Sequence, residues 1–370
     1  MMPSVYQLAF SSIKGINVDI ANELLSSVGS EENFFRMSDA DLREHTLLSD
    51  KLIDRKYRES LLIDADINLE LLARKNVRIE YFRNPTYPAR FQTVPDAPLT
   101  LFLSGDCNLN SKRVVSMVGT RHATMYGMDL CECFIKGLSE NVGNDVVIVS
   151  GLAYGIDIKA HRVALECGMP TIAVVAHGLD TIYPAQHRSD AVDIVRSNGA
   201  ILTEYKFNTR VHRSNFLSRN RLIAGLSDCT VVVESAEKGG ALVTANIALN
   251  YGRDVFAFPG RVSDEFSQGC NSLISKNVAM LINSYEDFIN AVGWEKKKVK
   301  PIEKELFPVV NGDEKKIYDF LTNRDYATIA ELIPVVCLPF HKLLSLLVGM
   351  EFNGLVRCLP GNRYSLIKNI

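Results

Sequence analysis

Hydrophobic and polar positions alternate most regularly between about residue 112 and residue 293. Short apolar runs that are rich in valine and isoleucine are separated there by amphipathic stretches of helical period. The runs read "VVSMVG", "DVVIVSG", "TIAVVAHG", "GAILTE", "CTVVVES", "DVFAFPG" and "AMLIN". Strands that alternate with helices in this way predict a doubly wound parallel α/β sheet. Because the runs are almost continuously apolar, we expect the strands to be buried on both faces.

The segment before this sheet has a helical pattern. In "LAFSSIKGINVDIANELLSSVG" apolar residues recur at roughly helical spacing, with a break at Lys14-Gly15. The pattern is similar to a helix-hairpin-helix (SAM-like) module, whose turn can present backbone N–H groups to a DNA phosphate. Since Asn17 replaces the second glycine of such a turn, we favour a packing role. The proline-rich stretch "NPTYPARFQTVPDAPLTLFLSGD" then predicts an extended connection rather than a helix.

The segment after the sheet begins with a lysine-rich linker and ends in a helical pattern. We expect the Lys296-Lys297-Lys298 run of the linker to be solvated. Three helices and two strands around a Pro-Gly-Asn turn then predict a winged-helix domain. Its third helix, "LPFHKLLSLLVGMEFNG", is mostly apolar, whereas a helix that reads a DNA groove presents several polar side chains. We therefore favour a packing or protein-contact role for this domain.

These patterns predict three domains and a linker. The expected segments are a helical domain over 1–80, a Rossmann-like domain with its extended connection over 81–293, a linker over 294–312 and a winged-helix domain over 313–370.

Composition and charge limit where this protein acts. The chain of 370 residues is 47% hydrophobic and has no run of eighteen apolar residues, so we expect no membrane span. It starts without a signal-peptide pattern, and its eight cysteines form no CxxC pair, which favours a reducing compartment, the cytoplasm. With a formal net charge of −2, any nucleic acid must bind to a local basic patch.

Such a patch lies in the long segment that follows the fourth strand of the pattern, which we expect to be a loop. Between Tyr205 and Ser227 there is no acidic residue, and the basic ones are Lys206, Arg210, His212, Arg213, Arg219 and Arg221. The rings of Tyr205, Phe207 and Phe216 are interleaved with them. Basic groups that follow a backbone, together with rings that stack on bases, are typical of single-stranded nucleic-acid binding. The alternative is a solvated loop whose rings turn into the core.

Two other loops predict an anion site. In a parallel sheet the loops at the carboxyl ends of the strands meet at one edge, where ligands bind. Gly119, Thr120 and Arg121 follow the first strand, and Gly151 follows the second. Glycine lets backbone N–H groups approach an anion closely, and helix N-termini attract negative charge. The glycine spacing is neither that of a dinucleotide fingerprint nor that of a Walker motif.

No catalytic motif stands out. The sequence has no Ser-His-Asp elbow, HExxH pair, zinc cluster or Walker motif, so we predict no enzyme, no metal and no cofactor. We expect the carboxylates near strand ends, Asp157, Glu204 and Glu234, to cap helices or balance arginines. His161 is expected to pack within a helix.

Taken in order, six motifs resemble one known family. They are "GTR", "SGLAYGIDIKAH", "GLDTIYP", "FLSRNRLIAGLSD", "VVVESAEKGGALVTANIALNYGRDVFAFPG" and "SQGCNSLI". The series is similar to the DNA-processing protein A (DprA/Smf) family over about Tyr87 to Ile282. The resemblance implies a cytoplasmic bacterial protein that binds and protects incoming single-stranded DNA during natural transformation. It further implies a homodimer formed through the α/β domain, help in loading the RecA recombinase, and no established enzymatic activity.

The resemblance also assigns roles by position. It implies DNA-binding roles for Gly119, Thr120, Arg121, Gly151, Arg213, Phe216, Arg219, Asn220, Arg221 and Gly240. Three positions depart from the family pattern. Tyr154 stands where many members have a basic residue, Leu217 replaces a common proline, and "GGAL" replaces a Ser-Gly-Ser-Leu run.

Two other functions stay open at this point. The sheet also resembles phosphoribohydrolase-like nucleotide-processing enzymes, in which Arg121 would hold a phosphate and Glu234 the sugar. Those enzymes carry a "PGGxGT" loop, whereas this chain has "EKGGALVT". The winged helix would suit a regulator that binds duplex DNA, but its apolar third helix argues against that role.

Overall fold

A computed structural model describes residues 3–295 and 312–367 of the protein. The chain separates into two compact units, Met1–Lys297 and Lys298–Ile370. Residues 296–311, which include most of the predicted linker and its lysine run, lie outside the described residues.

The first unit begins with helices, as the pattern predicts. They are α1 (Val5–Phe10), α2 (Val18–Val28), α3 (Glu31–Arg36), α4 (Asp39–His45), α5 (Asp50–Ile53) and α6 (Arg55–Arg74). Polar side chains cap most of them; for example, the carboxamide oxygen of Asn17 accepts from the backbone N–H of Ile20 at the start of α2. Arg58 of α6 is fully buried and donates to the backbone carbonyls of Phe34, Phe35 and Met37. These bonds tie the short helices to α6.

The sheet of this unit has nine strands in the order β1-β2-β6-β5-β4-β3-β7-β8-β9. They are β1 (Arg78–Tyr81), β2 (Thr100–Gly105), β3 (Arg113–Val118), β4 (Val146–Ser150), β5 (Thr171–Val174), β6 (Ala200–Thr203), β7 (Cys229–Val232), β8 (Asp254–Ala257) and β9 (Met280–Leu281). The strands from β3 to β9 are those the apolar runs predict, and all the pairings among them are parallel. The predicted doubly wound α/β fold is therefore confirmed.

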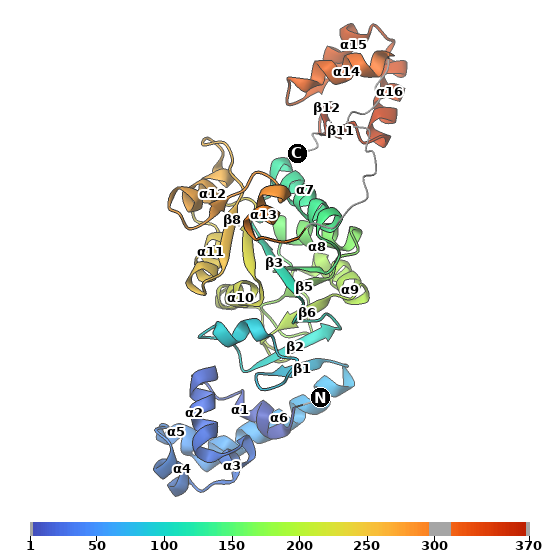
Figure 1. Cartoon of the computed structure of the whole chain (residues 1–370). Helices are drawn as coiled ribbons and strands as arrows, with labels where there is room; N and C mark the ends of the chain where they lie inside the picture. Colours follow the sequence, from blue (N-terminus) through green and yellow to red (C-terminus); the bar gives the residue numbers. More distant parts are fainter. Residues whose placement is uncertain (1–2, 296–311, 368–370) are drawn as a thin grey trace. The chain divides into compact units, whose positions relative to one another are not determined.

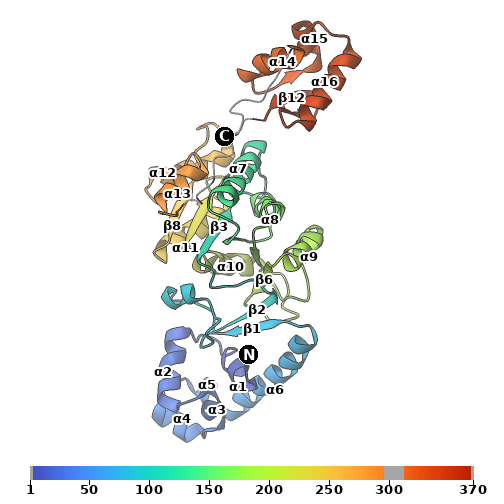
Figure 2. The ribbon, with the colours of Figure 1, turned by 45° about the vertical axis from the view of Figure 1, so that its right-hand side comes forward.

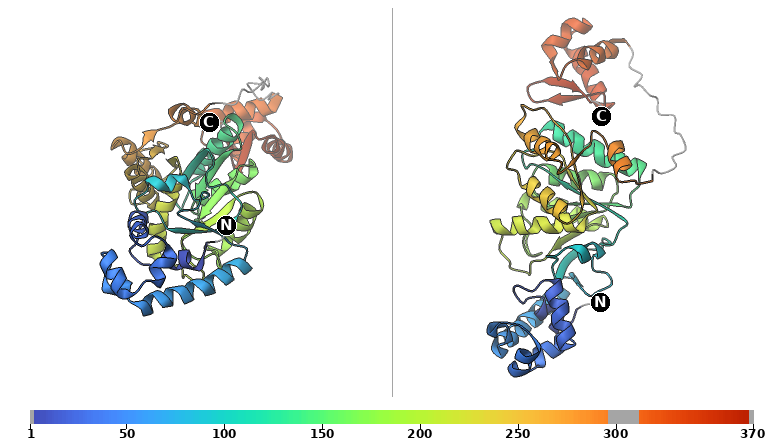
Figure 3. Two further views of the ribbon diagram at one scale, coloured as in Figure 1. Left: turned by 60° about the horizontal axis from the view of Figure 1, so that its bottom comes forward. Right: turned by 60° about the vertical axis from the view of Figure 1, so that its left-hand side comes forward.

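The connection before β3 is more regular than the sequence suggests. The short 3-10 helix η1 (Ala89–Thr93) and β2 lie in the stretch that was expected to be extended, and β1 lies just before it, at the end of the segment that was expected to be helical. The two strands join the edge of the sheet antiparallel, β2 against β6 and β1 against β2. Figures 2 and 3 show these strands, in light blue and cyan, between the N-terminal helices and the parallel strands.

Helices cover both faces of the sheet (Figure 1). One face carries α7 (Met125–Asn141), α8 (Ile156–Glu166), α9 (Arg188–Arg196) and α13 (Tyr285–Ala291). The other carries α10 (Arg213–Leu226), α11 (Gly240–Asn250) and α12 (Glu265–Ser275). Because successive strand residues point to opposite faces, Val115 and Met117 of β3 pack in the first layer and Val114 and Val118 in the second.

The strand order positions a crevice between β3 and β7. From β3 the chain continues into α7 on one face, whereas from β7 it continues into α11 on the other. The two loops diverge at the carboxyl ends of neighbouring strands, and this is the position at which doubly wound sheets bind ligands.

The second unit contains α14 (Gly312–Thr322), β10 (Ala327–Thr328), α15 (Ile329–Val336), α16 (Phe340–Phe352), β11 (Val356–Leu359) and β12 (Arg363–Leu366). The strand order is β10-β12-β11. The three helices and the strands β11 and β12 are those that the pattern predicts, whereas the two-residue strand β10 was not expected. The classification of this unit as a winged helix stays a prediction. On α16 the side chains of Leu343, Leu347 and Met350 are buried, while those of Phe340, Leu344, Val348 and Phe352 are exposed.

A search for membrane-spanning helices in the described part of the chain finds no single candidate. One bent pair, α15 with α16, meets the criteria of length and composition only when its two helices are taken together.

Candidate functional site

A cavity of about 340 Å³ opens in the crevice at the carboxyl ends of β3 and β7. Its walls come from the loop after β3, the first half of α10, the start of α11 and Phe266 of α12. Seven of the ten predicted site residues line it: Gly119, Thr120, Arg121, Phe216, Arg219, Asn220 and Gly240. We call it the crevice cavity. The fold therefore brings together residues from the loop after β3 and from the helices α10 and α11.

The loop after β3 is held in place by Glu234, the residue that follows β7. The backbone N–H of Thr120 donates to the carbonyl oxygen of Glu234 over 2.7 Å. The buried Glu234 carboxylate accepts from the backbone N–H and the hydroxyl of Thr124 at 2.9 and 2.5 Å, and Thr124 is the N-cap of α7. This confirms the helix-capping role predicted for Glu234, whose two carboxylate oxygens are both occupied.

Arg219 forms the floor of the crevice cavity and is itself only 4% exposed. Its guanidinium donates to the carbonyl oxygens of Gly151 and Val174. A Cβ atom on Gly151 would lie 2.3 Å from Nη1 of Arg219, so glycine is required there for the arginine to fit. Gly151 thus acts on the cavity through Arg219 and does not line it.

Burial shifts the pKa values of two charged groups at this floor. It lowers the pKa of Arg219 to about 10, an effect that the nearby carboxylate of Asp157 opposes. Burial also raises the pKa of Asp157, while the positive charge of Arg219 acts in the opposite direction. Asp157 therefore balances an arginine, as the sequence predicts. Within residues 3–295 and 312–367, Nε of Arg219 has no hydrogen-bond partner.

A cation and a ring meet at the mouth of the crevice cavity. The guanidinium carbon of Arg121 lies 5.6 Å from the ring centroid of Phe216. That of Arg219 lies 6.0 Å from the same centroid, and the ring of Tyr183 packs edge-on against Phe216 at 5.7 Å. Arg121 is exposed, so its charge is available to a ligand that contacts the Phe216 ring.

The opposite wall is the N-terminus of α11. Its N-cap residue, Gly239, provides no side-chain hydrogen bond, and Gly240 is exposed. A Cβ atom on Gly240 would meet no atom within 4 Å, so packing does not require glycine at this position. The free N–H groups of a helix N-terminus attract anions. The crevice cavity thus combines an exposed arginine, a helix N-terminus and an aromatic ring.

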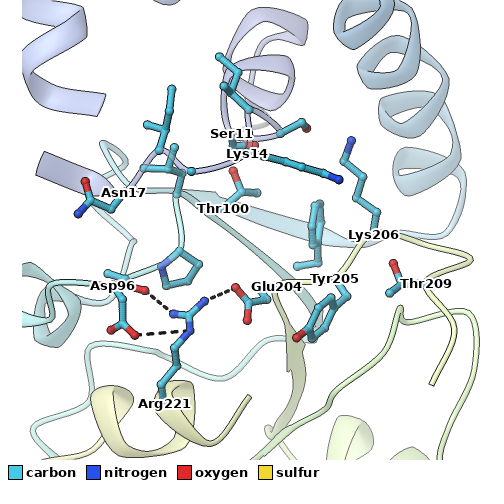
Figure 4. A pocket seen from close by; sticks show the side chains of 18 residues that line it. Ser11, Lys14, Asn17, Asp96, Thr100, Glu204, Tyr205, Lys206, Thr209 and Arg221 are labelled. Carbon is cyan, nitrogen blue, oxygen red and sulfur yellow. Dashed lines mark hydrogen bonds and ion pairs between the residues drawn. The ribbon is translucent and has the colours of Figure 1, made fainter. Parts of the chain in front are cut away.

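Two predicted site residues lie away from the crevice cavity. Arg221 donates to the Glu204 carboxylate and to the backbone carbonyl of Asp96, on a different flank of α10 (Figure 4). Glu204 therefore balances an arginine, as predicted. Arg213 is the exposed first residue of α10 and does not line the cavity.

The expectation of a long loop after β6 is wrong in its second half. Residues Arg213–Leu226 form the helix α10, which buries Leu222, Ile223 and Leu226 against the sheet. The arginines and asparagines of its first turns hide this apolar pattern in the sequence. The rings in this segment separate as well, because Phe207 packs against the core of the N-terminal helices.

Sequence reasoning gave no role to the exposed ring of Tyr183 beside this site, and it noted the exposed Tyr154 only as a departure from the family pattern. Tyr183 contacts Phe216, and the Tyr154 hydroxyl donates to Oε1 of Gln186 over 2.8 Å while its ring packs against His187. Tyr183 lies in the motif "GLDTIYP", where an aromatic residue between a turn and a proline was the available signal. His161, by contrast, is fully buried in α8 and bonds to the Thr171 hydroxyl, as the expected packing role requires.

Comparison with known proteins assigns the family. The family model described as DNA recombination-mediator protein A matches residues 78–293, more than half of the chain. This chain belongs to that family. The match includes β1 and β2 as well as every residue of the crevice cavity.

Individual relatives agree with this assignment. The DNA processing protein DprA of Streptococcus pneumoniae is 39% identical over 203 residues, which cover 55% of this chain and 70% of the relative. The X-ray structure of DprA from the same species superposes with a TM-score of 0.61 at 30% identity, covering 79% of this chain and 98% of that one. A structure of DNA processing protein A from Helicobacter pylori, whose subject is the single-stranded DNA binding mode of that protein, superposes with a TM-score of 0.52 at 31% identity. The match covers 58% of this chain and 95% of that one.

Proposed function

We propose that this recombination mediator binds single-stranded DNA in the crevice cavity, with a backbone phosphate at Arg121 and a base against Phe216. The observation that carries the proposal is the placement of an exposed guanidinium 5.6 Å from an aromatic ring, opposite a helix N-terminus. The guanidinium and the helix N-terminus are suited to a phosphate group, and the ring is suited to an unpaired base. The single-stranded DNA binding of the Helicobacter pylori relative supports the same ligand.

The proposal includes a role in natural transformation, in which the protein protects the incoming strand and helps to load RecA onto it. It also includes self-association through the α/β domain and a cytoplasmic location. None of the eight cysteines, all of which lie in the described residues, forms a disulfide bond, which supports a reducing compartment. The edge strand β9 exposes Met280 and Leu281, which supports association at that edge.

The nucleotide-processing alternative is less well supported by the geometry. It needs the Glu234 carboxylate to hold a sugar, but both oxygens of that carboxylate accept from Thr124, and Glu234 does not line the crevice cavity. We therefore propose a binding protein without catalytic activity.

The test is fluorescence anisotropy with a labelled single-stranded oligonucleotide over a salt series, with matched duplex as competitor. Arg121→Ala should weaken binding to all sequences about equally and reduce the slope of log affinity against log salt by about 0.7, the value for one phosphate contact on a single strand. Arg196→Ala is the control, because Arg196 is exposed at the end of α9, at the opposite edge of the sheet. No binding at low salt would refute the proposal, and release of free base from a nucleotide would favour the enzyme.

A further inference from the structure

A second and larger cavity lies between the N-terminal helices and the sheet. Its volume is about 660 Å³, against about 340 Å³ for the crevice cavity. The turn between α1 and α2 forms one wall, the segment from Asp96 to Thr100 a second, and the residues that follow β6 a third (Figure 4). We call it the hairpin cavity. The proposed function in the crevice cavity makes no use of it.

The hairpin wall presents unpaired donors. Lys14 is exposed and forms no ion pair within the described residues. In the same part of the chain, the backbone N–H groups of Lys14, Gly15 and Ile16 have no protein acceptor. Gly15 has a φ of +83°, a conformation that glycine adopts without strain. An ammonium group beside free backbone N–H groups is suited to a phosphate.

The sheet wall presents a ring and an unused hydroxyl. Tyr205 lines the cavity next to Lys206, whose ammonium group is paired with Asp64 of α6. Thr100 also lines the cavity and is 6% exposed, and its hydroxyl has no hydrogen-bond partner among the described residues. This wall therefore offers the Tyr205 ring to a ligand, while the Lys206 ammonium group is already paired.

The two cavities are connected along one flank of α10. A shallow groove is lined by Leu217, Ser218, Arg221 and Asp96, together with residues of α11. It shares Leu217 with the crevice cavity, and it shares Arg221 and Asp96 with the hairpin cavity. The cavities thus lie on two sides of one helix, on the order of 10 Å apart.

The two ends of this path are fixed relative to each other by hydrogen bonds. The Asn17 side chain donates to the carbonyl oxygen of Pro95. The next residue, Asp96, accepts at its backbone carbonyl oxygen from the guanidinium of Arg221 in α10. The hydroxyl of Tyr251, the residue that follows α11, donates to the Asp96 carboxylate. Because of these bonds, the hairpin and α10 present a continuous surface rather than two independent ones.

From this continuity we propose that the hairpin cavity is a second subsite for the same DNA strand. A strand held at Arg121 and Phe216 passes over Leu217 and Ser218 and enters the hairpin cavity. There a phosphate contacts Lys14 and the hairpin N–H groups, and a base contacts Tyr205. This inference rests on the proposed function. It assigns a DNA contact to the N-terminal helices, for which the sequence pattern favoured a packing role.

Oligonucleotides of two lengths separate the two subsites. A single-stranded oligonucleotide of about 2 nucleotides fills the crevice cavity only, whereas one of about 16 nucleotides spans both. Lys14→Ala in the full chain should weaken binding of the longer oligonucleotide about five- to tenfold and reduce its salt slope by about 0.7, with the shorter one unaffected. Lys14→Arg should restore most of the loss. Lys51→Ala is the matched control, an exposed lysine of α5 that does not line the cavity.

The outcomes distinguish this inference from the proposed function. If wild-type protein binds both lengths and Lys14→Ala changes neither, the hairpin cavity is not a DNA subsite. Equal weakening of the longer oligonucleotide by Lys14→Ala and Lys51→Ala would also overturn the inference, because the effect is then one of general charge. If wild-type protein binds neither length, the proposed function itself fails. Thermal unfolding of each variant shows whether the N-terminal helices stay folded.

Discussion

The guanidinium carbon of Arg121 lies 5.6 Å from the ring centroid of Phe216. The first residue follows β3 and the second lies in α10, so the contact exists only when the sheet and its helices are assembled. The ring attracts the cation from one side and leaves its N–H groups free to donate to a ligand. A nucleotide, which carries a phosphate next to a base, would contact both residues at once.

Removal of the Phe216 ring should weaken single-stranded DNA binding. Stacking of one base on an aromatic side chain contributes about 1–3 kcal/mol, so Phe216→Ala should raise the dissociation constant about 5- to 150-fold, whereas Phe216→Tyr should stay close to wild type. Anisotropy with the short oligonucleotide measures this. A loss as large in Phe216→Tyr as in Phe216→Ala would show that the ring serves packing rather than stacking.

Replacement of Arg221 should reduce stability more than binding. Arg221→Met leaves the half-buried Glu204 carboxylate without its partner, and burial already raises the pKa of Glu204. We expect the free energy of unfolding to fall by about 2–4 kcal/mol, and the double variant Arg221→Met/Glu204→Gln to recover most of it. Urea unfolding measures both. Normal stability with strongly reduced binding of the short oligonucleotide would instead make Arg221 a direct DNA contact.

Acid should destabilise the protein through His161. Burial lowers the pKa of this imidazole from 6.5 to about 3, so between these values the unfolded chain binds a proton that the folded chain does not. The free energy of unfolding therefore decreases as the pH falls below about 6.5, with a slope of up to about 1.4 kcal/mol per pH unit for this group. Burial lowers the pKa of His177 in the same direction, so part of the slope remains without His161.

The measurement is urea unfolding of His161→Gln at pH values between about 6.5 and 5, above the range in which the carboxylates titrate. The slope of the free energy of unfolding against pH should be smaller in the variant than in wild-type protein, whatever the absolute stability of the variant. His45→Gln, at an exposed histidine of α4, is the control. Equal slopes for wild-type protein and His161→Gln would show that His161 is accessible to protons in the folded state.

A charge at the edge strand β9 should abolish self-association. Leu281 is 43% exposed on the last strand of the sheet, and an arginine there would place a charge in an apolar contact. Light scattering should give the mass of a dimer for wild-type protein and that of a single chain for Leu281→Arg. Leu47→Arg changes an exposed leucine of the N-terminal helices and should remain dimeric. If Leu281→Arg also remains dimeric, the contact lies elsewhere.

The amino-acid sequence was sufficient to predict the seven parallel strands and the glycine-bearing loops at their carboxyl ends. Apolar runs and turn residues are local features, and the rule that these ends meet at one edge is general to parallel sheets. Those features predict an anion site at Gly119, Thr120 and Arg121, three residues that line the crevice cavity, and the resemblance added Phe216 and Gly240.

The roles of the arginines of α10 became clear only from the folded chain. Arg219 and Arg221 are two residues apart, which on a helix of 3.6 residues per turn directs their side chains about 200° apart. Arg219 is therefore buried as the floor of the crevice cavity and Arg221 pairs with Glu204 on another flank. The carbonyl and carboxylate partners that permit this burial come from distant parts of the chain, and no local pattern in the sequence contains them.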